Sequence, residues 1–182
     1  MKKEIPLSKA NRLINSGQVI LVSSSYKDKA NIITLAWNMP LSHKPALLGI
    51  SVAKAHLSCE LITKSREFVV NIPSVELFKQ VIYCGTHSGR EVDKFKETGL
   101  TPVKANRLIK TPLIGECIGN LECLLGDIKE VGDHNLFIGE AIYAQVENDL
   151  FREVWNTEKV KLIYHLGASF FTESGRLLES EQ

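Results

Sequence analysis

Short apolar runs separated by polar turns fill the first half of the chain. Aliphatic and β-branched residues gather in four runs, at positions 18–22, 32–36, 47–52 and 67–72. Runs of this length between turn signals are typical of β-strands. A polar stretch follows the first run, and Pro40 and Pro45 separate the second run from the third. We therefore expect four strands in this half.

Two segments of the same half have helical spacing instead. Residues 56–64 place three aliphatic side chains on one side, as an amphipathic helix does. A second helix is expected over residues 74–84, capped by Ser74 and closed near Gly85. Its inward-facing residues would be Val75, Phe78, Val81 and Ile82.

The second half of the chain is dominated by strands. Apolar residues follow a spacing of two near its centre, and Glu140 is the exception on the face that they share. These residues are Leu136, Ile138, Ile142, Ala144 and Val146. Residues 118–131 are expected to pair with this strand through a turn at 132–135.

Many strands, few helices and no regular alternation of the two predict a mainly β fold, an antiparallel barrel with a few peripheral helices. A GxGxxG fingerprint is absent from the sequence, which disfavours a dinucleotide-binding domain of the doubly wound type. The chain has 182 residues, and we expect one domain over residues 1–182.

Composition and charge narrow the classes of partner. The formal net charge is +1, so no general basic field indicates nucleic acid. No apolar run approaches the roughly 18 residues of a membrane span, and no apolar segment follows the basic start as in a signal peptide. We expect a soluble, cytoplasmic protein. Its four cysteines form no CxxC pair or zinc-finger spacing and are interpreted as free, buried thiols.

Four separated motifs together resemble one known family. They are NIITLAW (31–37), FVVNIP (68–73), CGTHSGREVDKF (84–95) and GDHNLFIGE (132–140). In this order they resemble the flavin reductase-like family, the flavoredoxin group of FMN-binding split barrels, from about Gly17 to about Phe171. The resemblance implies FMN as cofactor, a Greek-key-like split β-barrel and a homodimer with FMN near the subunit interface.

The turn after the third predicted strand is a candidate phosphate site. Lys54 supplies a positive charge there, and Ser58 could cap the following helix, whose N-terminus favours anions. From this segment alone, an ordinary cap beside an exposed lysine is favoured, and only the other motifs reverse that preference. The resemblance implies that this turn holds the phosphate side of FMN, with Ser58 where the family usually has Thr. The candidates are Ser51, Val52, Ala53, Lys54 and Ser58.

The first motif could contact the flavin ring. A flat ligand with a donor–acceptor edge suits pairing with strand backbone, and the resemblance places this stretch along the flavin. The candidates are Asn31, Thr34, Ala36 and Trp37. The alternative is an ordinary strand with Trp37 packed at its end. In the second motif, Asn71 is a polar residue inside an apolar strand, and we interpret it as a structural clamp in preference to a cofactor contact.

The third motif could be a second anion-binding loop. Ser88, Arg90 and Lys94 carry its useful groups, although such loops are often only solvated. The resemblance places this pattern near the flavin without deciding which of the three touches FMN. Cys84 opens the motif, and we interpret it as a packed thiol in preference to a redox group.

His134 lies in the Gly-Asp-His turn. From the residues alone, an ordinary turn histidine that bonds its own backbone is favoured. The resemblance implies a place near the entry of the nicotinamide, so His134 is a candidate for the substrate pocket. The chain departs from the family pattern at SHKPA (42–46) and at Gly167-Ala168. An amphipathic N-terminal stretch, 7–14, could cover a partner or its own barrel.

Three functions remain open at this point. In the first, NADH or NADPH reduces bound FMN, which passes electrons to free flavin, a metal complex or another protein. In the second, the protein is an electron carrier without direct NAD(P)H oxidation. The third is a flavin-free binding barrel. The basic and aromatic surface pattern of a nucleic-acid-binding barrel is absent.

Overall fold

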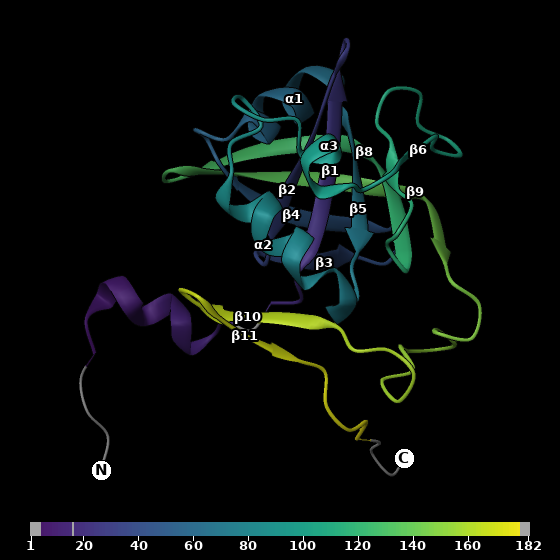
Figure 1. Cartoon of the computed structure of the whole chain (residues 1–182). Helices are drawn as coiled ribbons and strands as arrows, with labels where there is room; N and C mark the ends of the chain where they lie inside the picture. Colours follow the sequence, from purple (N-terminus) through teal and green to yellow (C-terminus); the bar gives the residue numbers. More distant parts are fainter. Residues whose placement is uncertain (1–4, 16, 179–182) are drawn as a thin grey trace.

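The computed structural model describes residues 5–15 and 17–178. Its main sheet has seven strands: β1 (Ile20–Tyr26), β2 (Lys29–Leu35), β3 (Asn38–Ser42), β4 (Leu47–Ala53), β5 (Glu67–Ile72), β8 (Gly119–Val131) and β9 (His134–Val146). The strand order is β2-β1-β5-β8-β9-β4-β3, and every neighbouring pair is antiparallel (Figure 1). The four strands predicted in the first half are confirmed as β1, β2, β4 and β5, and the proline-containing β3 was not predicted.

The sheet must curl strongly, because its two edge strands are consecutive in the chain. Only Ala36 and Trp37 lie between β2 and β3, which stand at opposite edges. The backbone N–H of Ser51 in β4 donates to the carbonyl oxygen of Trp37 at 2.9 Å, so the edges approach each other there. Within the described part of the chain, no ladder joins β2 to β3 or β4, and the closed barrel is therefore not confirmed.

Short helices cover the sheet: α1 (Leu57–Ser65), α2 (Phe78–Thr86) and α3 (Lys94–Thr98). Helix α1 packs against β1, and α2 against β2. Both predicted helices exist, with corrections at their ends. His56, not Ser58, is the N-cap of α1, and Ser74 precedes a 3-10 turn, η2 (Val75–Leu77), without a side-chain cap bond. Phe78, expected inward, is exposed.

The long hairpin of β8 and β9 is confirmed, but the apolar face predicted for β9 is not the buried one. Phe137 is fully buried, whereas Ile142 and Val146 are 36% and 39% exposed. The ladder skips Ile142, which marks a bulge in β9. The outer face of the sheet is consequently apolar over β3 and β9, where Leu41 and Leu136 approach each other across Gly49.

Buried polar side chains fix the loop between β6 (Pro102–Val103) and β7 (Leu113–Ile114). The Glu122 carboxylate accepts backbone N–H bonds from residues 106, 107 and 108 at 2.7–2.9 Å. Asn71 accepts from the Ile114 N–H and donates to the Leu21 carbonyl, both at 3.0 Å. The prediction that Asn71 is a structural clamp is therefore confirmed.

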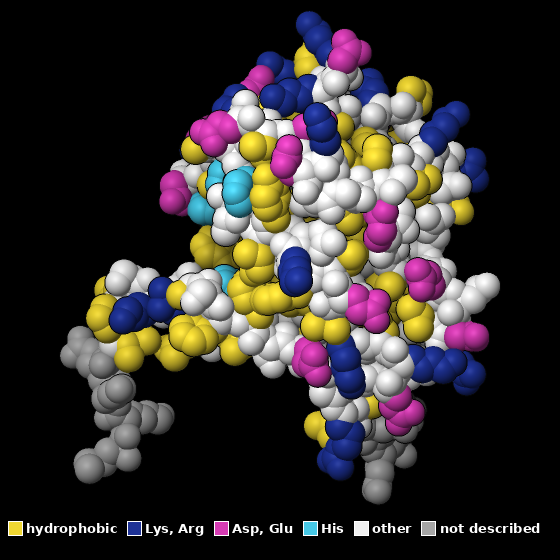
Figure 2. Space-filling view, viewed as in Figure 1, with side chains coloured by type: hydrophobic (Ala, Val, Ile, Leu, Met, Phe, Trp, Pro, Cys, Tyr) yellow, Lys and Arg dark blue, Asp and Glu magenta, His cyan; other side chains and the backbone are white. Residues whose placement is uncertain are grey.

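The N-terminal 3-10 helix η1 (Leu7–Leu13) lies with the hairpin β10 (Ile163–Gly167) and β11 (Phe170–Glu173) beside the main body (Figure 1). Leu7 and Leu13 are 91% and 76% exposed, so η1 does not cover its own sheet. Basic and acidic side chains are interspersed over the visible surface (Figure 2). No helix within the described residues is long and apolar enough to cross a membrane.

Candidate functional site

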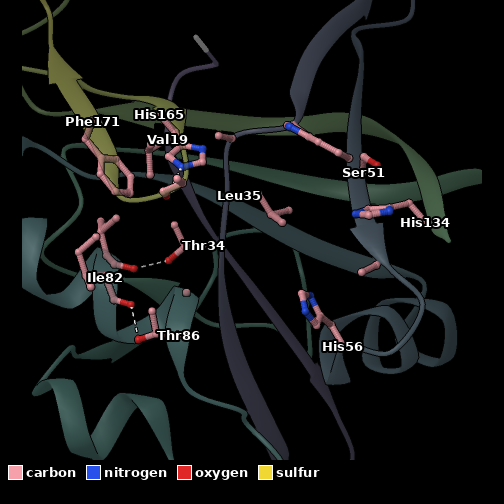
Figure 3. A pocket seen from close by; sticks show the side chains of 16 residues that line it. Val19, Thr34, Leu35, Ser51, His56, Ile82, Thr86, His134, His165 and Phe171 are labelled. Carbon is pink, nitrogen blue, oxygen red and sulfur yellow. Dashed lines mark hydrogen bonds between the residues drawn. The ribbon is translucent and has the colours of Figure 1, made fainter. Parts of the chain in front are cut away.

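Two neighbouring cavities lie where β2, β4, α1 and α2 meet. They measure about 310 Å³ and 230 Å³ and share His56, Gly85 and Thr86 in their linings, so they form one bent site. The first cavity is mostly apolar, with walls from the end of β2, from β4, α2, the tip of β9 and the β10–β11 hairpin (Figure 3). The second is more polar and lies beside the start of α1 and the loop after α2.

One wall of the first cavity is built by the strand edges. Trp37 follows β2 and packs its ring against that of His134, with the ring centroids 4.9 Å apart. Ser51 and Ala53 of β4 complete this wall. The Thr34 hydroxyl points toward α2 and donates to the Val81 carbonyl at 2.6 Å, which ties β2 to the helix.

His134 is held in place by its sequence neighbour. The Asp133 carboxylate lies 2.7 Å from Nδ1 of His134, and this hydrogen bond lowers the pKa of Asp133. With a carboxylate at Nδ1, the Nδ1–H tautomer is favoured, and Nε2 is left for other contacts. The ring therefore offers a fixed polar edge in the lining of the first cavity.

The opposite wall comes from the β10–β11 hairpin. The rings of His165 and Phe171 pack with centroids 4.8 Å apart, facing His134 and Ser51 across the cavity (Figure 3). His165 Nε2 lies 3.0 Å from the carbonyl oxygen of Ala168. Ala168 has a φ of +53°, a left-handed conformation in which glycine is favoured, so the departure at Gly167-Ala168 places a strained alanine on the cavity wall.

The second cavity contains a buried acceptor without a partner. Asn31 is only 3% exposed, and its Nδ2 donates to the Ser58 hydroxyl at 2.9 Å. Its Oδ1 accepts no hydrogen bond from any described residue. An unsatisfied buried carbonyl costs on the order of 1–3 kcal/mol. Oδ1 has almost no exposed surface and lies against Gly89, so a ligand hydroxyl would reach it only after the loop around Gly89 shifts.

Lys94 supplies the complementary donor in the same cavity. Its side chain is 5% exposed, and Nζ donates to the carbonyls of Ile32 at 2.8 Å and Cys84 at 2.6 Å. Burial lowers the pKa of Lys94, and the two carbonyls favour its charged form. An ammonium has three N–H donors, and these two acceptors leave one of them for a ligand.

Arg90 and Ser88 stand at the loop side of the second cavity. The Arg90 guanidinium is half-exposed and pairs with the Glu60 carboxylate of α1 at 3.2 Å. The Ser88 hydroxyl accepts the backbone N–H of Arg90 at 3.2 Å, which shapes the loop. Gly89 is required between them, because a Cβ at that position would lie 2.0 Å from Oδ1 of Asn31.

His56 lies at the junction of the two cavities. Burial, followed by the charges of Lys94 and His134, lowers the pKa of His56. Its imidazole is therefore biased toward the neutral form, which has one donor and one acceptor. The first N–H groups of α1 follow it directly and have no acceptor within the helix, which gives this end of the cavity a partial positive charge.

Comparison with known proteins agrees with the resemblance found in the sequence. The model of the Flavin reductase like domain matches residues 12–169. The chain belongs to the flavin reductase-like family. An uncharacterized protein of Archaeoglobus fulgidus is 36% identical over 154 residues, covering 84% of this chain and 86% of its own.

Solved structures of the flavin reductase-like family share the fold along the whole chain. Flavoredoxin from Methanosarcina acetivorans has a TM-score of 0.84 and 29% identity, covering 99% of this chain and 95% of its own. Flavoredoxin of Desulfovibrio vulgaris has a TM-score of 0.85 and 26% identity, covering 99% and 97%. A mainly β fold of the flavin reductase-like type is thus established.

Most of the site residues predicted from the sequence line the bent site. Those at the first cavity are Thr34, Ala36, Trp37, Ser51, Ala53 and His134, and those at the second are Asn31, Ser88, Arg90 and Lys94. Three predicted residues do not line either cavity. Val52 is in the core, Ser58 is fully buried and holds Asn31, and Lys54 pairs with Glu130 at 3.2 Å.

Sequence reasoning missed several residues of this bent site. They are His56, Gly85, Thr86, His165, Ala168 and Phe171 at the first cavity and His87 and Gly89 at the second. His87 and Gly89 lay inside a quoted motif, so a closer use of that motif could have found them. His165 and Phe171 carry no local signal, because the hairpin reaches the site only through the tertiary fold.

Cys84 is one of the residues that line the second cavity. It is 1% exposed, and burial raises its pKa to about 11. All four cysteines are free and buried, as predicted. A protonated, packed thiol is a poor nucleophile, which agrees with the packed interpretation of Cys84.

Proposed function

We propose that this protein is an FMN-dependent oxidoreductase that takes electrons from NADH or NADPH and passes them to free flavin, a metal complex or a protein acceptor. The observation that carries the proposal is the pairing of two incomplete polar groups in one cavity. Oδ1 of Asn31 lacks a donor, and Nζ of Lys94 has an N–H to spare. An anionic group would satisfy Lys94 directly, and a ligand hydroxyl would satisfy Asn31 once the loop at Gly89 has shifted to expose Oδ1. A purely apolar ligand satisfies neither.

The bent site fits the two parts of FMN. The apolar first cavity suits a planar ring, with backbone of β2 and β4 beside Ala36 and Ser51 for its polar edge. The second cavity suits the ribityl phosphate. There Asn31 would accept a hydroxyl, while Lys94, Arg90 and the N-terminus of α1 would bind the phosphate.

Bound FMN would supply the hydride and electron chemistry, so the protein needs no acid or base at the reacting atoms. The residues of the first cavity would bind and orient. Trp37 and His134 would form one side of the flavin pocket, and His165 and Phe171 the other, with His134 the candidate for the edge at which the nicotinamide enters. Enclosing the ring between these walls excludes water from it.

An electron carrier is the second candidate. Two solved relatives with the same fold are flavoredoxins, at 29% and 26% identity. A carrier needs the same FMN site without a nicotinamide pocket. The space between His134 and Phe171 would hold the flavin ring in both candidates, so reduction by NADH or NADPH is what separates them.

We further propose that the protein is a homodimer. Apolar side chains cover the outer face of β3 and β9, and Met39 and Leu41 are 48% and 41% exposed. This face is continuous with the first cavity, because Ser51 on the paired strand lines it. A second copy on this face would cover the apolar strip and one edge of the bound flavin.

Anaerobic titration of the FMN-loaded protein with NADH and NADPH tests the function. Loss of the visible flavin absorption on adding either nucleotide is the expected result. A yellow protein that neither nucleotide bleaches would contradict the reductase and favour the carrier. A protein that takes up no FMN would contradict both and favour the flavin-free barrel.

A further inference from the structure

The Arg90 side chain is shared between the second cavity and a carboxylate outside it. Arg90 lines the cavity, and its NH1 and NH2 both lie 3.2 Å from Oε2 of Glu60. Glu60 belongs to the first turn of α1 and does not line the cavity. The ion pair thus holds the loop after α2 to helix α1, with Arg90 turned toward Glu60.

The Glu60 carboxylate offsets two sources of positive charge at this end of the cavity, the Arg90 guanidinium and the N-terminal end of α1. Hydrogen bonds and charge from Lys64, at 2.7 Å, and then from Arg90 lower the pKa of Glu60, so it is anionic at neutral pH. It lies beside the N-terminal end of α1, whose partial positive charge attracts anions. An incoming phosphate would meet an arginine that is already neutralised and a carboxylate close behind it.

The other cation of the cavity is fixed in place. Lys94 is buried and bonded to two backbone carbonyls, so it cannot turn away from the site. Arg90 is 52% exposed at its side chain and paired only at the surface, where an ion pair contributes about 0.2–1 kcal/mol. Among the described residues that line this cavity, Arg90 is therefore the cation able to change partners.

We propose that Glu60 determines how tightly the site holds phosphorylated flavin, because Arg90 must leave Glu60 to bind the phosphate. This inference rests on the proposed FMN site. A phosphate dianion offers Arg90 two parallel hydrogen bonds, which are stronger than its contact with one exposed carboxylate oxygen. The exchange weakens FMN binding by the strength of the ion pair, and it leaves flavin without a phosphate unaffected. Glu60 thereby makes the cofactor easier to release.

Dissociation constants for FMN and riboflavin, measured by flavin fluorescence quenching, test this inference. Four proteins are compared: the wild type, Glu60→Gln, Arg90→Gln and the double variant. Glu60→Gln should bind FMN about three- to fivefold more tightly, which corresponds to removing one exposed ion pair, with riboflavin unchanged. Arg90→Gln should weaken FMN about tenfold or more. In the Arg90→Gln background, Glu60→Gln should have no further effect.

Glu91→Gln is the matched control. Glu91 is an exposed carboxylate next to Arg90 in the same loop, and it forms no ion pair with a described residue. Its replacement should change FMN affinity less than Glu60→Gln does. Thermal melting of each variant checks that the fold is intact.

Two results would overturn the inference while leaving the flavin site standing. One is an equal effect of Glu60→Gln on FMN and riboflavin. The other is a gain in FMN affinity that persists without Arg90, since it would come from Lys64 or from general electrostatics. Failure of the wild type to bind either flavin would instead reject the proposed function itself.

Discussion

Asn31 and Ser58 illustrate how far single residues could be predicted. Both were chosen from the sequence as flavin contacts, yet the Ser58 hydroxyl is engaged with Nδ2 of Asn31 and is fully buried. A motif identifies residues that matter to a site without separating those that face the ligand from those that hold them. Only the side-chain hydrogen bonds make that distinction.

Replacing Gly89 should weaken FMN binding as well as lower the stability of the fold. A Cβ in Gly89→Ala would lie 2.0 Å from Oδ1 of Asn31, so Asn31 or the loop must move. Such overpacking typically costs about 1–3 kcal/mol, and FMN affinity should fall about tenfold. Gly175→Ala, with nothing within 4 Å of the new methyl group, is the control. Equal FMN affinities for the two variants would contradict the position assigned to Asn31.

The cysteines should be unreactive in the folded protein. Burial raises the pKa of Cys84 to about 11 and that of Cys123 to about 12, and it also raises the pKa values of Cys59 and Cys117. At neutral pH a thiol reagent should therefore modify the native protein slowly. In denaturant, all four cysteines should react quickly. Fast modification of Cys84 in the native protein would contradict its packed environment.

At the scale of elements, periodicity predicted where strands lie better than which face they bury. The alternation in β9 correctly indicated a strand, but Phe137 on the opposite face is the residue in the core. An alternating strand with apolar residues on both faces does not show which face meets the core. Ser58 was wrongly predicted as the cap of α1. Serine is a favourable cap residue, but here the Ser58 hydroxyl accepts a hydrogen bond from Asn31, and His56 is the N-cap.

Glu122 should anchor the loop between β6 and β7. The Glu122→Gln variant would leave backbone N–H groups facing an amide donor, and we expect it to lose about 2–3 kcal/mol of unfolding free energy. Glu140→Gln, on an exposed position of β9, is the control and should lose little. Urea unfolding measures both. Equal stability of the two variants would show that the loop needs no anionic anchor.

The same carboxylate predicts a dependence of stability on pH. Burial opposes ionisation of Glu122, but the backbone N–H bonds from Leu108, Asn106 and Arg107 outweigh it and lower the pKa. A lowered folded pKa stabilises the fold above the unfolded value near 4.5, and this contribution is lost as the pH falls through the folded pKa. As the pH falls below about 4.5, the unfolding free energy of the wild type should therefore decrease more steeply than that of Glu122→Gln.

At the scale of the whole molecule, the proposed dimer gives the exposed apolar strip a role. Leu41→Asp places a charge in the strip and should shift sedimentation from dimer toward monomer. Ile109→Asp is the control, because Ile109 is 91% exposed on a loop away from the strip. A wild-type protein that sediments as a monomer at all concentrations would contradict the dimer.

The order of the strands could not be predicted from the sequence, whereas the family and the mainly β class could. Motif order identified the family because four short patterns occur together, although each is weak alone. The path that brings the β10–β11 hairpin to β2 depends on packing between segments more than 100 residues apart, which no local pattern encodes. The wall formed by His165 and Phe171 could therefore emerge only from the fold.

A crystal structure of the protein with FMN bound would decide where the cofactor lies. We expect the flavin ring in the first cavity, between Trp37 with His134 on one side and His165 with Phe171 on the other. We expect the ribityl phosphate in the second cavity, within hydrogen-bond distance of Asn31 and Lys94. Flavin bound elsewhere, or with its phosphate in the first cavity, would contradict the proposed site.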